Sequence, residues 1–238
     1  MSFYLDWDKP GEKFWETGVD RGVLFPQNPA DGTYEEGVVW NGLTSVKVTP
    51  SGGEPNAQYA DNIKYLNLFS LEEVGATIEA FTYPDEFMAC DGSAPVAANS
   101  KLYARTQTRK PFGFTWRSKV GNDLDDDAAY IIHILYGCKA SPSEREYNTV
   151  NESPEAQNMS WEITTTPPSI GVEGLKNTSL FEADTRNFVT AAEKAMITAL
   201  EQKLYGVAAD SAATPAVEEV KPAMPTVEQL ITMMSPQG

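Results

Sequence analysis

Residues 40–92 read WNGLTSVKVTPSGGEPNAQYADNIKYLNLFSLEEVGATIEAFTYPDEFMACDG, and this stretch decides the fold class. Val46 and Val48 end one run of β type, residues 63–69 form the next, and residues 74–83 alternate again between apolar and polar side chains. The Gly-, Pro- and Asn-rich residues 50–62 lie between the first two runs and are predicted to form a long loop. Loops of this length in a compact domain usually have a function or are disordered. We therefore expect this loop to be either functional or disordered.

Further strands are predicted on both sides of this stretch. In residues 112–117 aromatic side chains alternate with small or polar ones, which is the period of a half-buried strand. Residues 128–137 are apolar on both faces, as in a central strand that is covered on both sides. The Asn41-Gly42 dipeptide favours a tight hairpin turn inside a strand pair over residues 37–49. The remaining predictions are strands at 19–25 and 159–165 and a short turn at 84–92, whose first residues suit the N-terminus of a helix.

One segment has the period of an amphipathic helix. Apolar residues recur at every fourth position between residues 186 and 205, which favours a helix with one buried face. Asp184 or Thr185 is the predicted N-cap, and Gly206 is the predicted end. The recurring positions are Phe188, Ala192, Met196, Leu200 and Leu204. One helix among many strands indicates a mainly β fold, an antiparallel β-sandwich with one flanking α-helix.

The predicted folded domain comprises residues 1–206. Residues 207–225 are rich in Ala, Pro and Glu and nearly free of aromatic side chains, so they cannot bury enough surface to fold alone and are predicted to be a flexible linker. The C-terminal segment 226–238 contains TVEQLITMM, a short amphipathic pattern after Pro225. Two interpretations remain open for this segment: a helix that docks on a partner, or a segment that folds back on its own domain.

The chain is strongly acidic. Its formal net charge is −16, from 18 basic and 34 acidic residues. Such a charge repels phosphate and disfavours sequence-specific nucleic-acid binding. It suits either simple solubility or a conduit through which DNA slides without attachment. The sequence shows no secretory-signal pattern and no run of roughly twenty apolar residues that could span a bilayer. We therefore expect folding in a cytoplasm and no membrane insertion.

Residues suited to catalysis or metal binding are few. His133 is the only histidine and lies in an apolar strand pattern, so we interpret it as a hydrogen-bonded core or interface residue and not as a catalytic base. Cys90 and Cys138 lack metal-ligand spacing and are predicted to be buried and reduced. The acidic run 123–127 lacks the alternating ligands and the glycine of a calcium loop. We predict no catalytic residue, no cofactor, no metal and no enzymatic activity.

A basic block precedes this acidic run. No acidic residue occurs between Asp91 and Asp123, whereas six basic residues do. Complementary charges between subunits fix register and partner choice more than they raise affinity, and a solvated strand surface is the alternative interpretation. The candidate interface cations are Lys101, Arg105, Arg109, Lys110, Arg117 and Lys119. The candidate acidic residues, for the lumen of a conduit or for an interface, are Asp123, Asp125, Asp126 and Asp127.

Four motifs, taken together in their order and spacing, resemble one protein family. They are YADN after the Gly-rich segment, IEAFTYPDEF, FGFTWRSKVGND and YIIHILYGCKASPSEREYNT. With these motifs the chain resembles, from about Gly18 to Leu230, the major tail tube proteins of long non-contractile-tailed bacteriophages, the siphophages of Gram-positive hosts.

This resemblance implies a structural virion protein. Six copies would form a ring whose inner sheets join into a β-barrel around a lumen, and stacked rings would form the tail tube that conducts double-stranded DNA into the host. The implied partners are further copies of the chain, the tape measure protein, the tail terminator and the distal tail proteins, with assembly in the host cytoplasm. The long loop would contact a neighbouring ring or subunit, and the candidate residues are Ser51, Gly52, Gly53, Tyr59, Asp61 and Asn62.

The alternative function is a β-sandwich module that binds a carbohydrate or a receptor on a virion or cell surface. Such a module needs an exposed aromatic platform. Residues 112–116 supply one only if their aromatic face lies in solvent, whereas a tube subunit would bury it.

Overall fold

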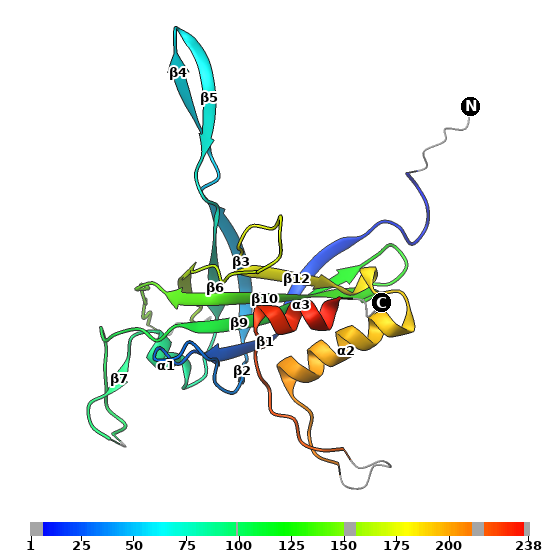
Figure 1. Ribbon diagram of the computed structural model, residues 1–238. Coiled ribbons are helices and arrows are strands. Elements are labelled where there is room, and N and C mark those ends of the chain that lie inside the picture. Colours follow the sequence, from blue (N-terminus) through cyan, green and yellow to red (C-terminus); the bar gives the residue numbers. More distant parts are fainter. Residues whose placement is uncertain (1–6, 99, 150–155, 211–216, 236–238) are drawn as a thin grey trace.

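The computed structural model describes residues 7–98, 100–149, 156–210 and 217–235, which form antiparallel β-sheets with two helices packed on one flank (Figure 1). The strands are β1 (Trp15–Pro26), β2 (Val38–Trp40), β3 (Leu43–Ser51), β4 (Pro55–Ala60), β5 (Ile63–Phe69), β6 (Glu73–Ala80), β7 (Ala94–Pro95), β8 (Tyr103–Ala104), β9 (Phe112–Gly121), β10 (Ala129–Ala140), β11 (Met159–Thr165) and β12 (Leu180–Asp184). The helical elements are α1 (Phe87–Cys90), the 3-10 turn η1 (Thr185–Asn187), α2 (Ala191–Tyr205) and α3 (Val227–Met234). The predicted mainly β, antiparallel class is confirmed.

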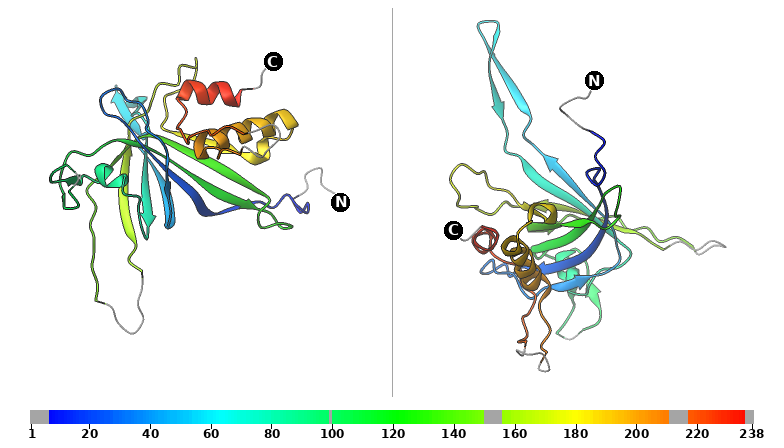
Figure 2. Two further views of the ribbon diagram at one scale, coloured as in Figure 1. Left: turned by 90° about the horizontal axis from the view of Figure 1, so that it is seen from below. Right: turned by 90° about the vertical axis from the view of Figure 1, so that its right-hand side faces the viewer.

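One large sheet organises the domain. Its strands follow the order β2-β1-β9-β10-β11-β6-β3, and β12 also pairs with β10. Every pair in this sheet is antiparallel. The sheet curls so that two leaves meet at an angle (Figure 2, left), which is consistent with the predicted sandwich. In the described residues its end strands β2 and β3 do not pair, so a single chain does not close a barrel.

β10 is the strand at which the sheet divides. Its first half, from Ile131 to Leu135, pairs with β12, and its last residues, from Cys138 to Ala140, pair with β11. Between these two halves Gly137 has a φ of 63°, and a Cβ there would lie 2.3 Å from the carbonyl oxygen of Thr166. Only glycine fits this position. The bend allows β11, β6 and β3 to turn away from β12.

An aromatic core fills the inside of the curl. Trp40 is 2% exposed, and its ring lies 4.4 Å from that of Phe87 and 5.6 Å from that of Trp161, measured between centroids. The indole N–H of Trp40 donates to the carbonyl oxygen of Thr82 at 2.9 Å. The alternating aromatic residues of β9 point into the same core, as the period of two predicts, and all are buried: Phe112, Phe114 and Trp116.

A second core lies between the opposite face of the sheet and the helices (Figure 2). Ile132 and Ile134 of β10 are buried there against Leu200 and Leu204 of α2 and against Leu230 of α3. The other face of β10 contributes to the aromatic core. β10 is therefore covered on both faces, which confirms the prediction from its continuous apolar pattern.

The structure has a second flanking helix, and α2 begins later than its apolar period predicts. The actual N-cap is Thr190, whose hydroxyl accepts from the amide of Glu193 while the Glu193 carboxylate accepts from the amide of Thr190. This reciprocal capping box outweighs the apolar signal upstream. Asp184, one of the two predicted caps, instead caps η1. The helix ends before Gly206, as predicted.

The segment after α2 returns to the domain. Tyr136 donates from its hydroxyl to the carbonyl oxygen of Pro225 at 2.9 Å, and Val227 and Leu230 of α3 are buried. Within the predicted linker, Val207 bridges to Val220. Of the two interpretations of residues 226–234, the structure supports folding back onto the chain's own domain. Residues 211–216 and 236–238 lie outside the described part.

Two local predictions are wrong. The strands on either side of Asn41-Gly42 do not pair with each other, because β2 pairs with β1 and β3 pairs with β6. Gly42 has a φ of 77°, and its carbonyl oxygen accepts from the amide of Phe81, so this dipeptide carries the chain from one leaf to the other. Residues 50–62 are also not a loop, since β4 forms within them and pairs with β5. Pairing with an adjacent strand overrides the turn-like composition.

Both cysteines are free and buried in the aromatic core. Burial raises the pKa of the Cys90 thiol to about 12 and raises the pKa of Cys138 well above its usual range. Because the thiolate is the reactive form, we expect the native chain at about pH 8 to resist a thiol reagent such as DTNB. The same sample should release the signal of both thiols in denaturant. Reaction of the folded chain at the denatured rate would contradict this prediction.

Candidate assembly surfaces and a histidine cluster

β4 and β5 form a long hairpin that projects away from the rest of the domain (Figure 1). Their pairing runs from Pro55 opposite Phe69 to Ala60 opposite Ile63. At the tip, Asp61 and Asn62 have φ values of 50° and 64°. A two-residue type I′ turn requires positive φ at both of these positions. Asp61 and Asn62, predicted as contact residues, therefore form the turn at the far end of the hairpin.

Apolar side chains cover this hairpin and lie in solvent. Every residue of β5 is exposed, Tyr59 of β4 is 72% exposed, and Leu71 at the base is 84% exposed. The other large exposed residues are Ile63, Tyr65, Leu66, Leu68 and Phe69. An isolated two-stranded hairpin is at best marginally stable in water, and large exposed apolar patches mark interaction sites. The hairpin is the strongest candidate for a surface that another molecule covers.

The remaining candidates of this region hold the hairpin on the sheet. Ser51 is the last residue of β3 and lies opposite Glu73. Gly52 and Gly53 follow with φ values of 80° and 73°. A Cβ on Gly52 would lie 2.2 Å from the carbonyl oxygen of Leu71, so a side chain is excluded there. Ser51, Gly52 and Gly53 thus lie at the base of the hairpin. The other three candidates, Tyr59, Asp61 and Asn62, lie in its distal part.

The four candidate aspartates lie in one exposed turn between β9 and β10. Asp123 Oδ1 accepts from the amides of Gly11 at 2.9 Å and Lys13 at 3.4 Å, which ties the turn to the residues before β1. Asp125 Oδ1 accepts from the amide of Asp127. In the described part of the chain, no group of three or more His, Cys, Asp or Glu side chains is placed to hold a metal ion. The geometry is that of a solvated acidic turn.

Four of the six basic candidates have ion-pair partners inside the chain. Arg117 donates two hydrogen bonds of 2.7 Å to the carboxylate of Asp20, and this lowers the pKa of Asp20. The other pairs are Arg105 with Asp91, Lys110 with Glu35, and Lys119 with Asp127. Lys101 is exposed and Arg109 is partly buried. A role of this block between subunits stays a prediction, and much of its charge is balanced within one copy.

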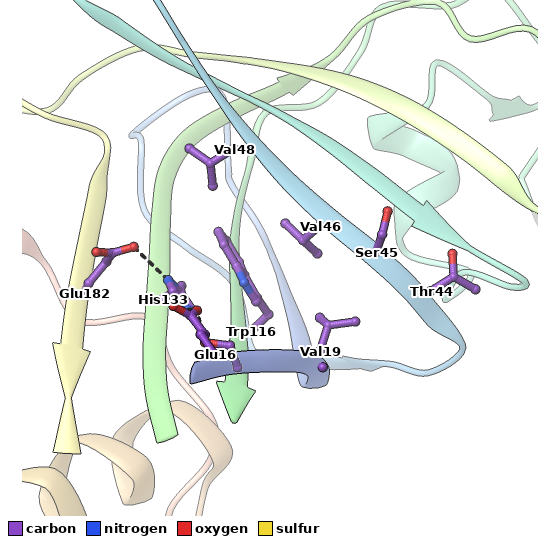
Figure 3. Close-up of a pocket in the computed structure, with 11 residues that line it drawn as sticks. Glu16, Val19, Thr44, Ser45, Val46, Val48, Trp116, His133 and Glu182 are labelled. Carbon is purple, nitrogen blue, oxygen red and sulfur yellow. Dashed lines mark hydrogen bonds and ion pairs between the residues drawn. The ribbon is translucent and has the colours of Figure 1, made fainter. Parts of the chain in front are cut away.

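A polar cluster surrounds His133 on the inner face of the sheet (Figure 3). His133 is 6% exposed and its ring stacks on Trp116, with 4.8 Å between the ring centroids. Its Nδ1 lies 3.0 Å from Glu182 Oε1, and its Nε2 lies 2.8 Å from Ser118 Oγ. The Ser118 hydroxyl in turn donates to Glu16 Oε1 at 2.5 Å. The cluster lines a cavity of about 410 Å³ that opens between β1 and β3.

Ser118, His133 and Glu182 have the connectivity of a serine-hydrolase triad. Two features of their surroundings disfavour that chemistry. The Ser118 proton is directed to Glu16 and not to the imidazole. In addition, Ser118 lies inside β9, opposite Ile131 of β10, and not in a turn or at a helix N-terminus, which are the places that commonly present free backbone amides as an oxyanion hole. His133 is the hydrogen-bonded core residue that the sequence predicts.

Sequence reasoning missed the partners of His133. Glu16, Ser118 and Glu182 come from three different strands, and the strand register brings them together. Trp116 and Glu182 lie directly opposite His133 on its two neighbouring strands. Alternation of apolar and polar residues gives the face of each strand but not the pairing between distant strands. The sequence signal was limited to the placement of His133 on a buried face.

Comparison with known proteins adds little to this geometry. No protein-family model matches the chain, and a search of curated proteins found no match. Among solved structures, the chain is similar to one from the cryo-EM structure of the anti-feeding prophage baseplate, 6-fold symmetrised. The sequences are 6% identical, the match covers 75% of this chain and 97% of that one, and the TM-score is 0.34. A TM-score this low does not establish a shared fold. Within the described residues, no helix has the length and apolar character needed to cross a bilayer.

Proposed function

We propose that this chain is a structural virion protein that polymerises, as stacked hexameric rings, into the tail tube of a long-tailed bacteriophage. The tube conducts double-stranded DNA into the host, and its ends contact the tape measure, terminator and distal tail proteins. The sequence resemblance motivates the proposal. The single structural observation that carries it is the β4–β5 hairpin, whose apolar side chains lie in solvent in an isolated copy.

The hairpin favours assembly of a particular kind. It extends beyond its own domain, and in the proposed tube it contacts a surface of a neighbouring copy that differs from itself. Such a heterologous contact closes into a ring or continues as a stack. Among the residues that the structure describes, the outer edges of β2 and β3 have no strand partner, and this is a second reason for assembly, because unpaired strand edges lead to uncontrolled pairing unless they are covered. A ring in which adjacent copies pair these edges resolves both problems.

Polymerisation of the purified protein tests the proposal. We expect hollow tubes of constant width in electron micrographs at high protein concentration, with a sedimentation profile that shifts with concentration. Addition of tail partners should nucleate tubes where the chain alone is slow. A species that stays monomeric at high concentration, with those partners present, would overturn the proposal.

The acidic turn makes a separate prediction. If the four aspartates line the lumen, they repel passing DNA, and this repulsion is screened beyond about 8 Å at physiological salt. Replacing all four with Asn should leave tubes intact and slow genome ejection from variant phage. The fold should persist, because Asn keeps the oxygen that accepts from the amides of Gly11 and Lys13. The residues changed are Asp123, Asp125, Asp126 and Asp127.

A matched control removes the same charge elsewhere on the exposed surface. It replaces each of four glutamates with Gln: Glu144, Glu146, Glu173 and Glu218. This control should assemble and eject normally. If the aspartate variant instead assembles poorly, most visibly at low salt, the aspartates bridge subunits. Normal tubes and normal ejection in the aspartate variant would exclude both roles.

The alternative function, binding of a carbohydrate or receptor, loses the feature it requires. Phe112, Phe114 and Trp116 are all buried in the aromatic core, so the aromatic face of β9 offers no platform in solvent. A sugar-binding surface of stacked rings needs such faces to be accessible. The exposed aromatic residues of the hairpin lie on a projecting pair of strands. This arrangement suits insertion into another protein surface better than the stacking of a sugar ring on a flat aromatic platform.

A further inference from the structure

A surface cavity of about 770 Å³ lies beside the first turns of α2. Its walls come from β9, β10, η1 and α2, and from Phe14, which precedes β1. The floor is apolar, since Ile197 of α2 is buried and Tyr130 and Phe188 are half-buried. At the rim, Val189 is 73% exposed. Large side chains of a partner protein anchor in concave sites of this kind.

The charges at this cavity leave one cation unbalanced. Three ion pairs inside the chain neutralise the other charged side chains that line it. These pairs are Arg117 with Asp20, Arg186 with Asp184, and Asp127 with Lys119. Among the described residues the Lys194 ammonium has no ion-pair partner, and Lys194 is exposed on α2. The cavity therefore combines an apolar floor with one available cation, in a chain whose net charge is −16.

The tip of the β4–β5 hairpin has the complementary features. Tyr59, Ile63 and Tyr65 lie in solvent near the tip. Asp61 in the turn is exposed and is the only acidic residue between positions 55 and 69. No ion pair within the described part of the chain engages its carboxylate. An apolar centre with charged groups at the rim is the usual anatomy of a protein–protein interface.

We propose that the cavity beside α2 receives the hairpin tip of a second copy, with Asp61 of one copy paired to Lys194 of the other. This inference rests on the proposed function and names the surface on which the hairpin docks. One copy does not make the contact with itself, because its hairpin projects away from α2 (Figure 1). The hairpin and the cavity are different surfaces, so the contact is heterologous and each copy offers one of each.

The apolar and charged contacts have different roles in this docking. Removal of Tyr59, Ile63 and Tyr65 from water favours association in proportion to the apolar area that is buried. The pair between Asp61 and Lys194 adds less affinity, but it fixes partner choice and register. Exposed carboxylates elsewhere on this acidic chain repel Asp61, whereas the cavity attracts it. Reversal of the charge at Lys194 is therefore a specific probe of the docking site.

Cross-linking between two variants, each with one added cysteine, tests the contact. Tubes are assembled from equal amounts of Ala60→Cys and Thr198→Cys, which place exposed thiols at the hairpin tip and at the cavity. A short bismaleimide reagent then joins thiols that lie close together. The native thiols do not interfere, because burial raises the pKa of Cys90 to about 12 and that of Cys138 well above its usual range. We expect a cross-linked dimer from the mixture and none from either variant alone.

A charge series gives a second measurement. Lys194→Glu brings two carboxylates together in the proposed contact, and it should raise the critical concentration for polymerisation about tenfold at low salt, because like charges disfavour association. Addition of Asp61→Asn should return this concentration to within about threefold of the wild-type value, since interacting charges are not additive. Asn tolerates the positive φ of the turn. The control Lys139→Glu makes the same charge change at an exposed position outside the cavity and should behave as the wild type.

The outcomes separate this inference from the proposed function. Tubes of normal width without a cross-link in the mixture, or with an unchanged critical concentration in Lys194→Glu, would overturn the docking site and leave the tube function standing. A cross-link within Ala60→Cys alone would show that hairpin tips meet each other and would also overturn the docking site. A mixture that cross-links without forming tubes would support the docking site and overturn the tube function. A chain that stays monomeric would overturn both.

Discussion

Deleting residues 54–70, so that Gly53 joins Leu71, is expected to abolish tube formation while the domain stays folded. The deleted residues contact the rest of the domain mainly through the hairpin base, where Ser51 lies opposite Glu73. Gly52, Gly53, Leu71 and Glu72 remain after the deletion, and these four residues are sufficient to connect Ser51 to Glu73. Because loop length changes stability only weakly, the free energy of unfolding should change by about 1 kcal/mol or less. The critical concentration for polymerisation should rise by at least about 100-fold, since about 2.7 kcal/mol of contact energy is lost.

The boundaries of this deletion matter. Removal of β4 alone would leave β5 as an unpaired apolar strand, which promotes aggregation. A gentler variant replaces Leu66 and Leu68 with Ser and keeps the hairpin. Its matched control replaces Leu102, a 67% exposed leucine outside the hairpin and outside the acidic turn, with Ser. Sedimentation should show impaired assembly in the hairpin variants and normal assembly in the control. Tubes of normal width from the deletion variant would show that the hairpin is dispensable.

Trp40→Ala is expected to give the largest loss of stability of any single change considered. Trp40 is nearly fully buried, contacts three other aromatic rings and donates a hydrogen bond to Thr82. Truncation of a buried tryptophan to alanine typically costs about 3–5 kcal/mol, because the lost contacts leave a cavity. Domains of ordinary stability have about 5–15 kcal/mol in total. Urea unfolding at constant temperature should therefore show a markedly lower midpoint or an unfolded chain.

Two control variants separate packing from the other roles of Trp40. Trp40→Phe keeps an aromatic ring but loses the indole N–H, so its cost should be clearly smaller than that of the alanine variant. Leu102→Ala changes a large apolar side chain that is 67% exposed and should alter stability by about 0.5 kcal/mol or less. If Trp40→Ala unfolds at the wild-type midpoint, the aromatic core does not stabilise the domain as the structure indicates.

The spacing of apolar residues along the sequence predicted the central strands β9 and β10 well. The alternation in β9 and the continuous apolar run in β10 each have one physical explanation, namely burial on one face and on two faces. The pairing around Asn41-Gly42 was not predictable in this way. A dipeptide that favours a hairpin turn also serves a corner, and the choice depends on which strands lie next to β2 and β3 after the chain has folded.

Only part of the candidate site was predicted from the sequence, again because local patterns do not reveal how distant segments pack. Composition predicted a loop over residues 50–62, and the family resemblance implied that it contacts a neighbouring subunit. The structure shows a hairpin there instead of a loop. The apolar residues of β5 give it the sequence pattern of an ordinary strand. Their exposure to solvent was therefore evident only from the structure. The partners of His133 depend on register across several strands, which no local pattern encodes. Charge runs, similarly, did not reveal that Arg117 pairs with Asp20.

The bend at Gly137 has a mechanical consequence. Traction applied to the β4–β5 hairpin passes along β3 and β6 to β11. β11 pairs with β10 over three residues, from Cys138 to Ala140, and one backbone hydrogen bond extends this pairing on each side, from Thr166 to Gly137 and from Ser141 to Glu162. The helices and β12 are anchored on the other side of the bend. The leaf that bears the hairpin is thus joined to the other leaf by a short length of backbone pairing and by the aromatic core between them. In a polymer linked through the hairpins, load would pass between the leaves through these two connections and not through the helix-covered face.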